Sequence, residues 1–243
     1  MKSIVVDDLN LHVQECGDPA GQPVVFANSL GTDMRVWDKV LARLPRDLRI
    51  IRFDKRGHGL SDVSPAPYTM DMLATDTAAI LDHLSVKGAV FVGLSIGGMI
   101  GLRLSTMRPD LVSALLLMDS AAKIGTTEMW RDRITALETG GIANLSAPIL
   151  ERWFTPAFHR QHPEELAMWR NMLERTSPEG YIGCCAAIAA ADLTQDTAKL
   201  SLPFLALAGA QDGATPPDLV RATAALVLGA GAGANFHQID GAG

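Results

Sequence analysis

Residues 89–98 of the chain read Ala89-Val90-Phe91-Val92-Gly93-Leu94-Ser95-Ile96-Gly97-Gly98. An apolar run comes first, a G-x-S-x-G motif follows it, and a helical pattern then extends from Ile96 to about Met107. In this context the motif places its serine on a sharp strand-to-helix turn, with the hydroxyl exposed above a sheet. Glycines beside the serine suit such a strained turn. The segment predicts Ser95 as a nucleophile; the alternative is a glycine-rich turn that carries an idle serine.

Further short apolar runs predict the other strands of the same sheet. These runs are residues 24–27, 50–53, 114–118 and 204–208. Short runs without polar alternation fit strands that are buried on both faces of a parallel sheet. Residues 4–6 and 11–13, separated by a turn-like cluster, predict an antiparallel pair before them. The helical pattern of residues 71–84 lies between two runs, as right-handed strand–helix–strand units require.

The alternation of strands and helices stops halfway along the chain. Residues 126–192 show a helical pattern throughout and hold three of the four tryptophans. We interpret them as a helical cap inserted into a core of residues 1–125 and 193–243, above the sheet edge where ligands bind in such folds. A pair of long crossovers is the alternative, although loops of that length are rare. Residues 229–234 are expected to form a loop that leads into a last strand, 235–239.

An oxyanion hole needs two backbone N–H donors. One is expected from Ile96, the residue after the candidate nucleophile. The loop Asn28-Ser29-Leu30-Gly31 follows the run 24–27, where the second donor belongs, and we assign that donor to Leu30. A plain turn is the alternative, because Asn, Ser and Gly are common turn residues.

These motifs resemble those of the α/β-hydrolase superfamily over the whole chain. The chain also resembles the 3-oxoadipate enol-lactonases of the β-ketoadipate pathway in a larger set of segments. These are residues 27–33 with Trp37, 53–61, 93–98, 123–125, 152–156, 180–181 with 185–188, and 212 with 215–217. The Arg-Gly-His-Gly and G-x-S-x-G motifs are common to the superfamily and indicate little about the substrate. The Asn-Ser-Leu-Gly loop and the cap segments are more specific.

In α/β-hydrolases the triad follows the order serine, acid, histidine. Asp212 comes directly after the run 204–208 and is our choice for the acid, which would orient and stabilise the imidazolium. Asp119, after the run 114–118, is the alternative. The resemblance implies an Ala-Gly-His pattern after the last strand, so the base is expected one residue beyond Gly243, followed by a final helix. None of the six histidines present replaces it convincingly, and without a base Ser95 is a weak nucleophile.

The resemblance to the lactonases implies a reaction, which is hydrolysis of an enol-lactone to 3-oxoadipate. Ser95 would attack the lactone carbonyl, and the N–H groups of Leu30 and Ile96 would hold the oxyanion. The ring would open with an enolate as leaving group, and water would release the acyl-enzyme. The resemblance implies neither a metal nor an organic cofactor.

The implied substrate carries a carboxylate, so a cationic group should face it. Arginine is the preferred partner because its guanidinium binds a carboxylate through two hydrogen bonds. Arg131, Arg133 and Arg152 in the cap are candidates, with an exposed helix arginine as the alternative. Trp130 and Trp153 are candidates for the pocket wall, or else part of the core of the cap.

Composition narrows the class of protein further. The chain of 243 residues is 48% hydrophobic, which is ample for a sizeable core, and its net charge is −6. No basic stripe is present, so nucleic acid is not expected as a partner, whereas a few local arginines can still attract a small anion. No apolar run reaches the roughly 18 residues of a membrane span, so no membrane partner is expected.

The cysteines and the N-terminus predict a cytoplasmic location. The three cysteines, Cys16, Cys184 and Cys185, are an odd number and form no disulfide framework. The adjacent pair is interpreted as two buried helix residues rather than as a redox or metal site. The first residues lack the apolar region of a signal peptide.

Two other function classes stay open. One is a different serine hydrolase, such as a carboxylesterase, a C–C bond hydrolase or a perhydrolase. The other is a non-catalytic binding protein on the same fold. Because the lactonase family is sometimes fused to a decarboxylase, the resemblance also allows such a domain beyond Gly243.

Overall fold

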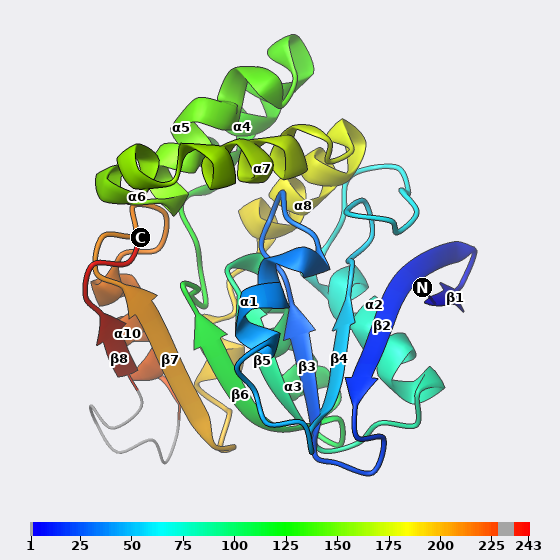
Figure 1. Ribbon diagram of the computed structural model, residues 1–243. Coiled ribbons are helices and arrows are strands. Elements are labelled where there is room, and N and C mark those ends of the chain that lie inside the picture. Colours follow the sequence, from blue (N-terminus) through cyan, green and yellow to red (C-terminus); the bar gives the residue numbers. More distant parts are fainter. Residues whose placement is uncertain (1, 228–235) are drawn as a thin grey trace.

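A single mixed sheet forms the centre of the protein (Figure 1). The computed structural model describes residues 2–227 and 236–243, and the strands within them have the order β1-β2-β4-β3-β5-β6-β7-β8. The strands are β1 (Lys2–Val6), β2 (Leu9–Gly17), β3 (Pro23–Ala27), β4 (Arg49–Phe53), β5 (Ala89–Leu94), β6 (Val112–Met118), β7 (Phe204–Gly209) and β8 (Phe236–Ile239). Strands β3 to β8 run parallel, while β2 pairs antiparallel with both β1 and β4. The predicted parallel sheet and the antiparallel pair before it are confirmed.

Burial follows the sequence pattern of each strand. In the parallel part, Val25, Ile51 and Phe91 have no exposed surface, because layers cover both faces of the sheet. In β2, Leu11 and Val13 are fully buried and their neighbours are not, because this strand has one face on the core. The continuous and the alternating apolar patterns therefore mark the centre and the outer part of the same sheet.

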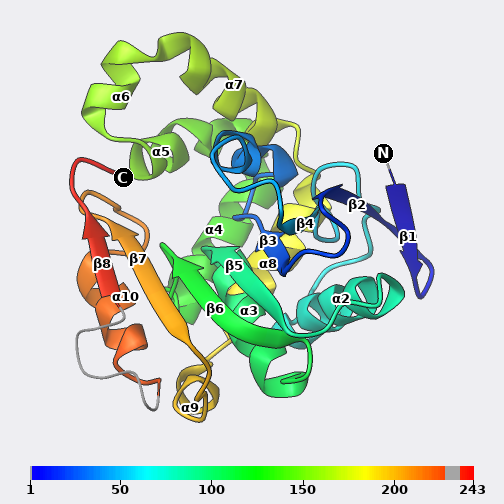
Figure 2. The same ribbon diagram turned by 60° about the horizontal axis from the view of Figure 1, so that its bottom comes forward.

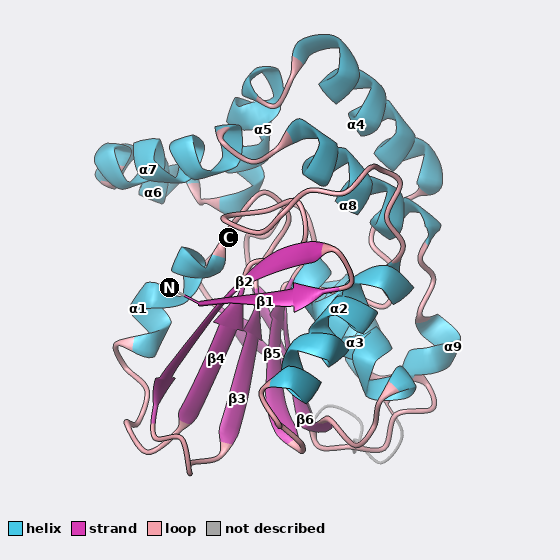
Figure 3. Ribbon diagram, turned by 90° about the vertical axis from the view of Figure 1, so that its right-hand side faces the viewer, coloured by secondary structure: helices cyan, strands magenta, loops and turns pink. Residues whose placement is uncertain are grey.

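Helices cover the two faces of the sheet (Figures 1 and 3). Helices α2 (Met70–His83), α3 (Ile96–Met107) and α10 (Pro217–Ala224) lie on one face. The short η1 (Met34–Trp37) and α1 (Asp38–Leu41) lie on the other, and α9 (Thr194–Thr197) packs near α3. The two predicted helices of the core are confirmed, since α2 begins one residue before the predicted start and α3 has the predicted bounds.

A layer of helices lies over the carboxyl ends of the parallel strands (Figures 1 and 2). It consists of α4 (Thr127–Gly140), α5 (Ala143–Trp153), α6 (Pro156–Gln161), α7 (Pro163–Glu174) and α8 (Pro178–Ala190). Thr126, Thr155 and Ser177 cap three of these helices, each accepting a hydrogen bond from the N–H three residues on. The predicted helical pattern of 126–192 is therefore present as five helices, and we call this layer the helical cap.

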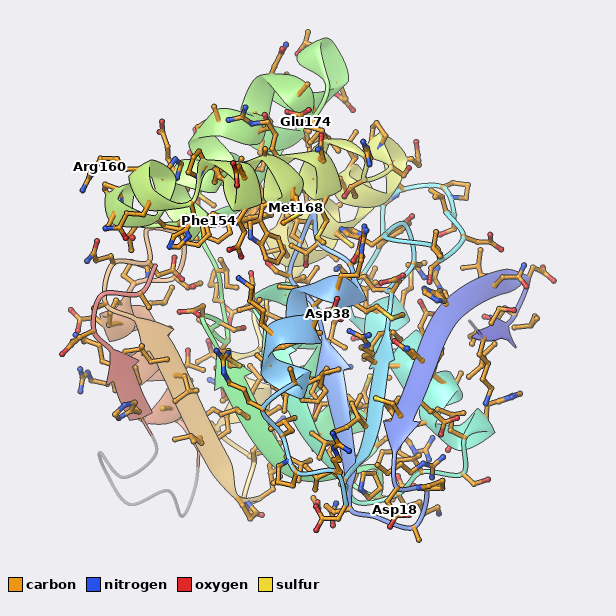
Figure 4. All side chains as sticks on the ribbon, in the orientation of Figure 1. Asp18, Asp38, Phe154, Arg160, Met168 and Glu174 are labelled. Atoms are coloured by element: carbon orange, nitrogen blue, oxygen red, sulfur yellow. The ribbon has the colours of Figure 1, made fainter. Side chains whose placement is uncertain are left out.

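Contacts between the helical cap and the sheet hold the two close together. Lys39 of α1 forms an ion pair with Glu165 of α7. A β-carbon added to Gly57 would lie 2.3 Å from the Cα of Gly180 in α8, so the close approach of these two backbones requires glycine. Figure 4 shows Phe154 on the side of the helical cap that faces the sheet and Arg160 at its outer end.

The helices and the cysteines bear on two further predictions from the sequence. In the described parts of the chain, no helix combines the length and the apolar character that crossing a membrane would take. The three cysteines are free thiols, and Cys184 and Cys185 are buried in α8, as their interpretation as helix residues expects. The predicted loop 229–234 and residue 235 of the predicted last strand lie outside the described residues, and β8 supplies the rest of that strand.

Candidate active site

Ser95 occupies a strained turn between β5 and α3. Its φ of 55° and ψ of −121° lie outside the regions that L-residues favour. Hydrogen bonds to the segment at the end of β6 hold this conformation. The Ser95 N–H donates to the Met118 carbonyl at 2.9 Å, and the Ser95 carbonyl accepts from the Ser120 hydroxyl at 2.6 Å. A β-carbon on Gly97 would lie 2.1 Å from the Ala27 carbonyl oxygen, so only glycine fits at that position. This strain is the geometry that the G-x-S-x-G motif predicts.

Both residues predicted to donate to the oxyanion lie near Ser95, since Ile96 follows it in the chain and Leu30 lines a cavity with it. Ile96 begins α3, and Leu30 lies in the loop after β3, next to β5 in the sheet. Within the described residues neither the Ile96 N–H nor the Leu30 N–H has an acceptor, whereas the neighbouring Gly31 N–H donates to Nε2 of His58 at 3.0 Å. Two unoccupied N–H donors near a serine at a helix N-terminus can stabilise a developing oxyanion.

Two cavities meet at Ser95 below the helical cap. The first, of about 190 Å³, is lined by Trp153, Phe154 and Trp169 on its apolar side and holds two carboxylates. The second, of about 270 Å³, is lined by arginine side chains of the cap and contains no carboxylate. We call them the acidic cavity and the cationic cavity. Because Ser95 lines both, a group attacked by its hydroxyl has negative charge on one side and positive charge on the other.

The acidic cavity brings together both candidate acids, Asp119 and Asp212. Asp212 accepts hydrogen bonds from the N–H groups of Ala214 and Thr215 and from the Thr215 hydroxyl. Three donors of this kind hold the Asp212 carboxyl group in one orientation. Asp119 accepts one, from the Gly209 N–H at 2.8 Å, and burial, with a smaller effect of the neighbouring Asp212 charge, raises its pKa to about 7. Asp212 is therefore the better oriented of the two carboxyl groups to position a base, and Asp119 is its protonated neighbour.

Replacing Asp119 with asparagine is expected to make stability less dependent on pH. Folded Asp119 keeps its proton up to about pH 7, whereas an unfolded aspartate loses it near about pH 4, so the wild type loses stability as the pH rises between these values. Asparagine can still accept from Gly209 and carries no charge. We expect Asp119→Asn to gain about 1–3 kcal/mol relative to the wild type between about pH 4 and pH 8 in urea unfolding. A difference in the free energy of unfolding between Asp119→Asn and the wild type that stays constant with pH would contradict this expectation.

None of the six histidines, all within the described residues, hydrogen bonds to Ser95 or Asp212. Their positions are as follows: His12 bonds Asp54, His58 bonds Gly31, His159 bonds the Leu150 carbonyl, His162 packs on Phe158, and His83 and His237 are exposed. Gly243 lines the acidic cavity, and a β-carbon on it would lie 3.1 Å from the Trp153 carbonyl oxygen. The last described residue of the chain therefore lies at the wall of the acidic cavity, packed closely against the end of α5.

The cationic cavity contains two of the three candidate arginines, Arg133 and Arg152. Arg133 lies with its guanidinium carbon 5.1 Å from the centre of the Trp130 ring, and it neighbours the Tyr181 hydroxyl. Neither of the two arginines forms an ion pair with a carboxylate of the described residues. Trp130 and Trp153, both predicted pocket residues, line the same cavity.

Arg131 was a candidate for the same role, and the structure does not bring it to the site. Arg131 is exposed and lines neither cavity. The reason is helical geometry: residues two apart in α4 point about 200° apart, so Arg131 and Arg133 cannot share a face. Arg131 is therefore a natural control for experiments on Arg133.

Comparison with known proteins matches this arrangement to one family. A family model described as alpha/beta hydrolase fold matches residues 22–140. The chain is 35% identical to 3-oxoadipate enol-lactonase 2 of Acinetobacter baylyi over 213 residues, which are 88% of this chain and 80% of that protein. The chain belongs to the α/β-hydrolase family. The span matched by the family model includes the oxyanion loop, the nucleophile turn and Asp119, but not Asp212.

Solved structures of α/β-hydrolases have the same fold. The enol-lactonase from Burkholderia xenovorans LB400 superposes with a TM-score of 0.92 at 33% identity, over 98% of this chain and 90% of that one. A thermophilic esterase from Thermogutta terrifontis, solved with malate bound, superposes with a TM-score of 0.90 at 26% identity, over 100% of this chain and 91% of that one.

Some residues of the site were not predicted from the sequence. Thr215 donates to Asp212, and its position three residues after an aspartate is a turn signal that could have indicated this contact. Phe154 and Trp169 line the acidic cavity, and Tyr181 lines the cationic one. No local pattern distinguishes these aromatic residues from the core of the helical cap.

Proposed function

We propose that this α/β-hydrolase opens an anionic enol-lactone, 3-oxoadipate enol-lactone, through an acyl-enzyme on Ser95. The observation that carries this proposal is the position of Ser95 between the two cavities. The cationic cavity holds Arg133 and Arg152, which have no carboxylate partner among the residues that the structure describes, and this suits the carboxylate of such a substrate. The acidic cavity holds Asp212 and Asp119, which suit the proton transfers.

In the proposed mechanism, the Ser95 hydroxyl oxygen attacks the lactone carbonyl carbon. Its proton passes to a base that Asp212 orients, which we expect to be a histidine after Gly243. The N–H groups of Leu30 and Ile96 stabilise the oxyanion of the tetrahedral intermediate. The ring C–O bond then breaks and releases an enolate, which takes up a proton and becomes the ketone. Water attacks the remaining ester and returns the hydroxyl to Ser95.

The relatives support the substrate class. Two of them are named as 3-oxoadipate enol-lactonases and one solved structure as an enol-lactonase. The thermophilic esterase of the second solved structure has bound malate, which is a small dicarboxylate. These names support a small carboxylate-bearing substrate for this chain as well.

Arg133→Met is expected to impair turnover of the anionic lactone selectively. A hydrogen bond to a charged group contributes about 1.5–3 kcal/mol, so kcat/KM for 3-oxoadipate enol-lactone should fall about 10- to 100-fold. The neutral α-angelica lactone has the same enol-lactone ring without the carboxylate, and its kcat/KM should stay within about twofold. Loss of the ultraviolet absorbance of the enol-lactone follows both reactions.

Arg131→Met is the matched control, because Arg131 lies on the same helix and outside the cavity. It should leave both reactions unchanged. An equal loss on both lactones in Arg133→Met would mean that this arginine supports the pocket rather than binds the carboxylate. A wild-type protein that hydrolyses simple esters and neither lactone would refute the lactonase proposal and favour a general esterase.

A further inference from the structure

The loop that carries the Leu30 N–H rests on a buried lysine. Lys55 follows β4, and only 3% of its surface is exposed. Its Nζ donates hydrogen bonds to the carbonyl oxygens of Ser29, at 2.6 Å, and of Asn28, at 3.3 Å. It forms no ion pair with a carboxylate of the described residues. Burying a cation without such a partner costs free energy, which suggests that Lys55 has a role at this loop.

The surroundings keep Lys55 charged at neutral pH. Burial lowers the pKa of Lys55 to about 8, and the neighbouring Cys184, Asp54 and Asp33 oppose that shift. His58 also faces this loop, and burial and the Lys55 charge hold the pKa of His58 well below its usual range. Neutral His58 therefore acts as an acceptor for the Gly31 N–H, while the Lys55 ammonium offers donors to the carbonyls before it.

The peptide group between Ser29 and Leu30 links this lysine to the oxyanion hole. A peptide group is planar and almost always trans, so the Ser29 carbonyl and the Leu30 N–H point in opposite directions. The carbonyl points to Lys55 inside the protein. Ser29 and Leu30 both line the cationic cavity with Ser95, and the Leu30 N–H has no acceptor among the described residues. A second donor, the Thr32 hydroxyl, reaches the same carbonyl at 3.0 Å.

We propose that Lys55 is a positioning residue of the oxyanion hole: by holding the Ser29 carbonyl inside the protein, it aims the Leu30 N–H at the oxyanion formed on Ser95. The inference rests on the proposed function only in taking Ser95 as the nucleophile of an acyl transfer, and it does not depend on the lactone. Donors aimed in advance at the developing charge are what makes an oxyanion hole effective. Without the ammonium, the Ser29 carbonyl keeps only the Thr32 hydroxyl, at 3.0 Å, and the long Thr32 N–H contact, at 3.4 Å, so the direction of the peptide group between Ser29 and Leu30 is held less firmly.

Lys55→Met tests this inference, because methionine has a similar length and no donor. With p-nitrophenyl acetate as substrate, kcat should fall at least about tenfold, towards the hundred- to thousandfold that follows loss of an oxyanion donor, while KM changes by less than about twofold. The affinity for phenylboronic acid, which forms a tetrahedral adduct on the serine, should fall by a similar factor. Lys87→Met, at a side chain that is 75% exposed, is the matched control and should change neither.

Each outcome decides the inference. Values of kcat and boronate affinity in Lys55→Met within about twofold of the wild type would overturn it, and so would a loss confined to KM. If Lys55→Met does not fold, Lys55→Gln keeps a polar side chain at this position that ends one atom short of the Nζ position. A lower kcat at unchanged KM in that variant then supports the inference, and a kcat within about twofold of the wild type overturns it. If the wild type hydrolyses no ester, the phenylboronic acid affinity of Lys55→Met relative to the wild type tests the inference by itself. A wild-type protein that hydrolyses p-nitrophenyl acetate but not the lactone would refute the proposed substrate, and the inference about Lys55 would still stand.

Discussion

In a chain that carries a histidine after Gly243, Ser95→Ala is expected to lower ester and lactone hydrolysis by about a thousandfold or more. Removing the nucleophile of a serine hydrolase removes the covalent route and leaves only the oxyanion hole and substrate binding, which retain a small fraction of the rate. Ser95 lines both cavities, and its strained backbone holds the hydroxyl beside two unoccupied N–H donors. Initial rates with p-nitrophenyl acetate and with the enol-lactone measure the loss. Labelling by a fluorophosphonate, detected as a mass increase, should disappear in the same variant.

Ser29→Ala provides a matched control, because Ser29 is a second serine that lines both cavities. It should retain activity to within about tenfold, since its hydroxyl has no place in the covalent route. An equal loss of activity in Ser95→Ala and Ser29→Ala would show that any substitution in the cavity impairs hydrolysis, and it would contradict the role of Ser95 as the nucleophile. A chain with the histidine after Gly243 that neither hydrolyses an ester nor takes up the label would favour a non-catalytic binding protein on this fold.

A histidine placed after Gly243 is expected to raise turnover about a hundred- to ten-thousandfold above a matched chain with alanine there. A serine without a general base is a weak nucleophile, and a base in hydrogen-bond reach typically contributes a factor of that size. Gly243 lines the acidic cavity with Ser95 and Asp212, and no histidine of the described residues bonds to either. The activity gained should appear as the pH rises through about 6.5, the usual imidazole pKa.

The chain with the added histidine also shows which of the two aspartates, Asp212 or Asp119, is the acid of the triad. In the chain with the added histidine, Asp212→Asn should cost far more activity than Asp119→Asn, because a carboxylate that orients the imidazole is worth up to about ten-thousandfold. Three hydrogen bonds fix the orientation of the Asp212 carboxyl group, whereas burial keeps Asp119 protonated up to about pH 7. Equal activity with histidine and alanine would contradict the expected base. A larger loss in Asp119→Asn would reverse the assignment of the acid.

Most of the fold could be read from local patterns. The strands β3 to β7 coincide within two residues at each end with the apolar runs, because a strand buried on both faces has to be continuously apolar. The bounds of α3 follow from the glycine-rich turn before it and from Arg108, where the helical backbone ends. The helical pattern of 126–192 is recognisable as a whole, but its division into separate helices depends on caps and prolines that its overall pattern does not resolve.

The site was predicted unevenly. The nucleophile and the oxyanion loop have motifs of their own, because each needs a particular backbone conformation that few residues adopt. The arginines have no such requirement, and Arg131 and Arg133 look alike in the sequence although only Arg133 lines the cavity. Lys55 comes directly before the Arg-Gly-His-Gly motif, and nothing in the sequence there reveals that its Nζ reaches the Ser29 carbonyl.

The amino-acid sequence alone establishes the parallel sheet, the turn that carries Ser95 and the loop that carries Leu30. These features depend on hydrophobic periodicity and on backbone conformations at single residues, both of which are local properties of the chain. The pairing of Asp119 with Asp212, the separation of acidic and cationic cavities and the contact of Lys55 with Ser29 appear only in the tertiary structure. They join residues far apart in sequence, and their charge states depend on burial, which no local pattern specifies.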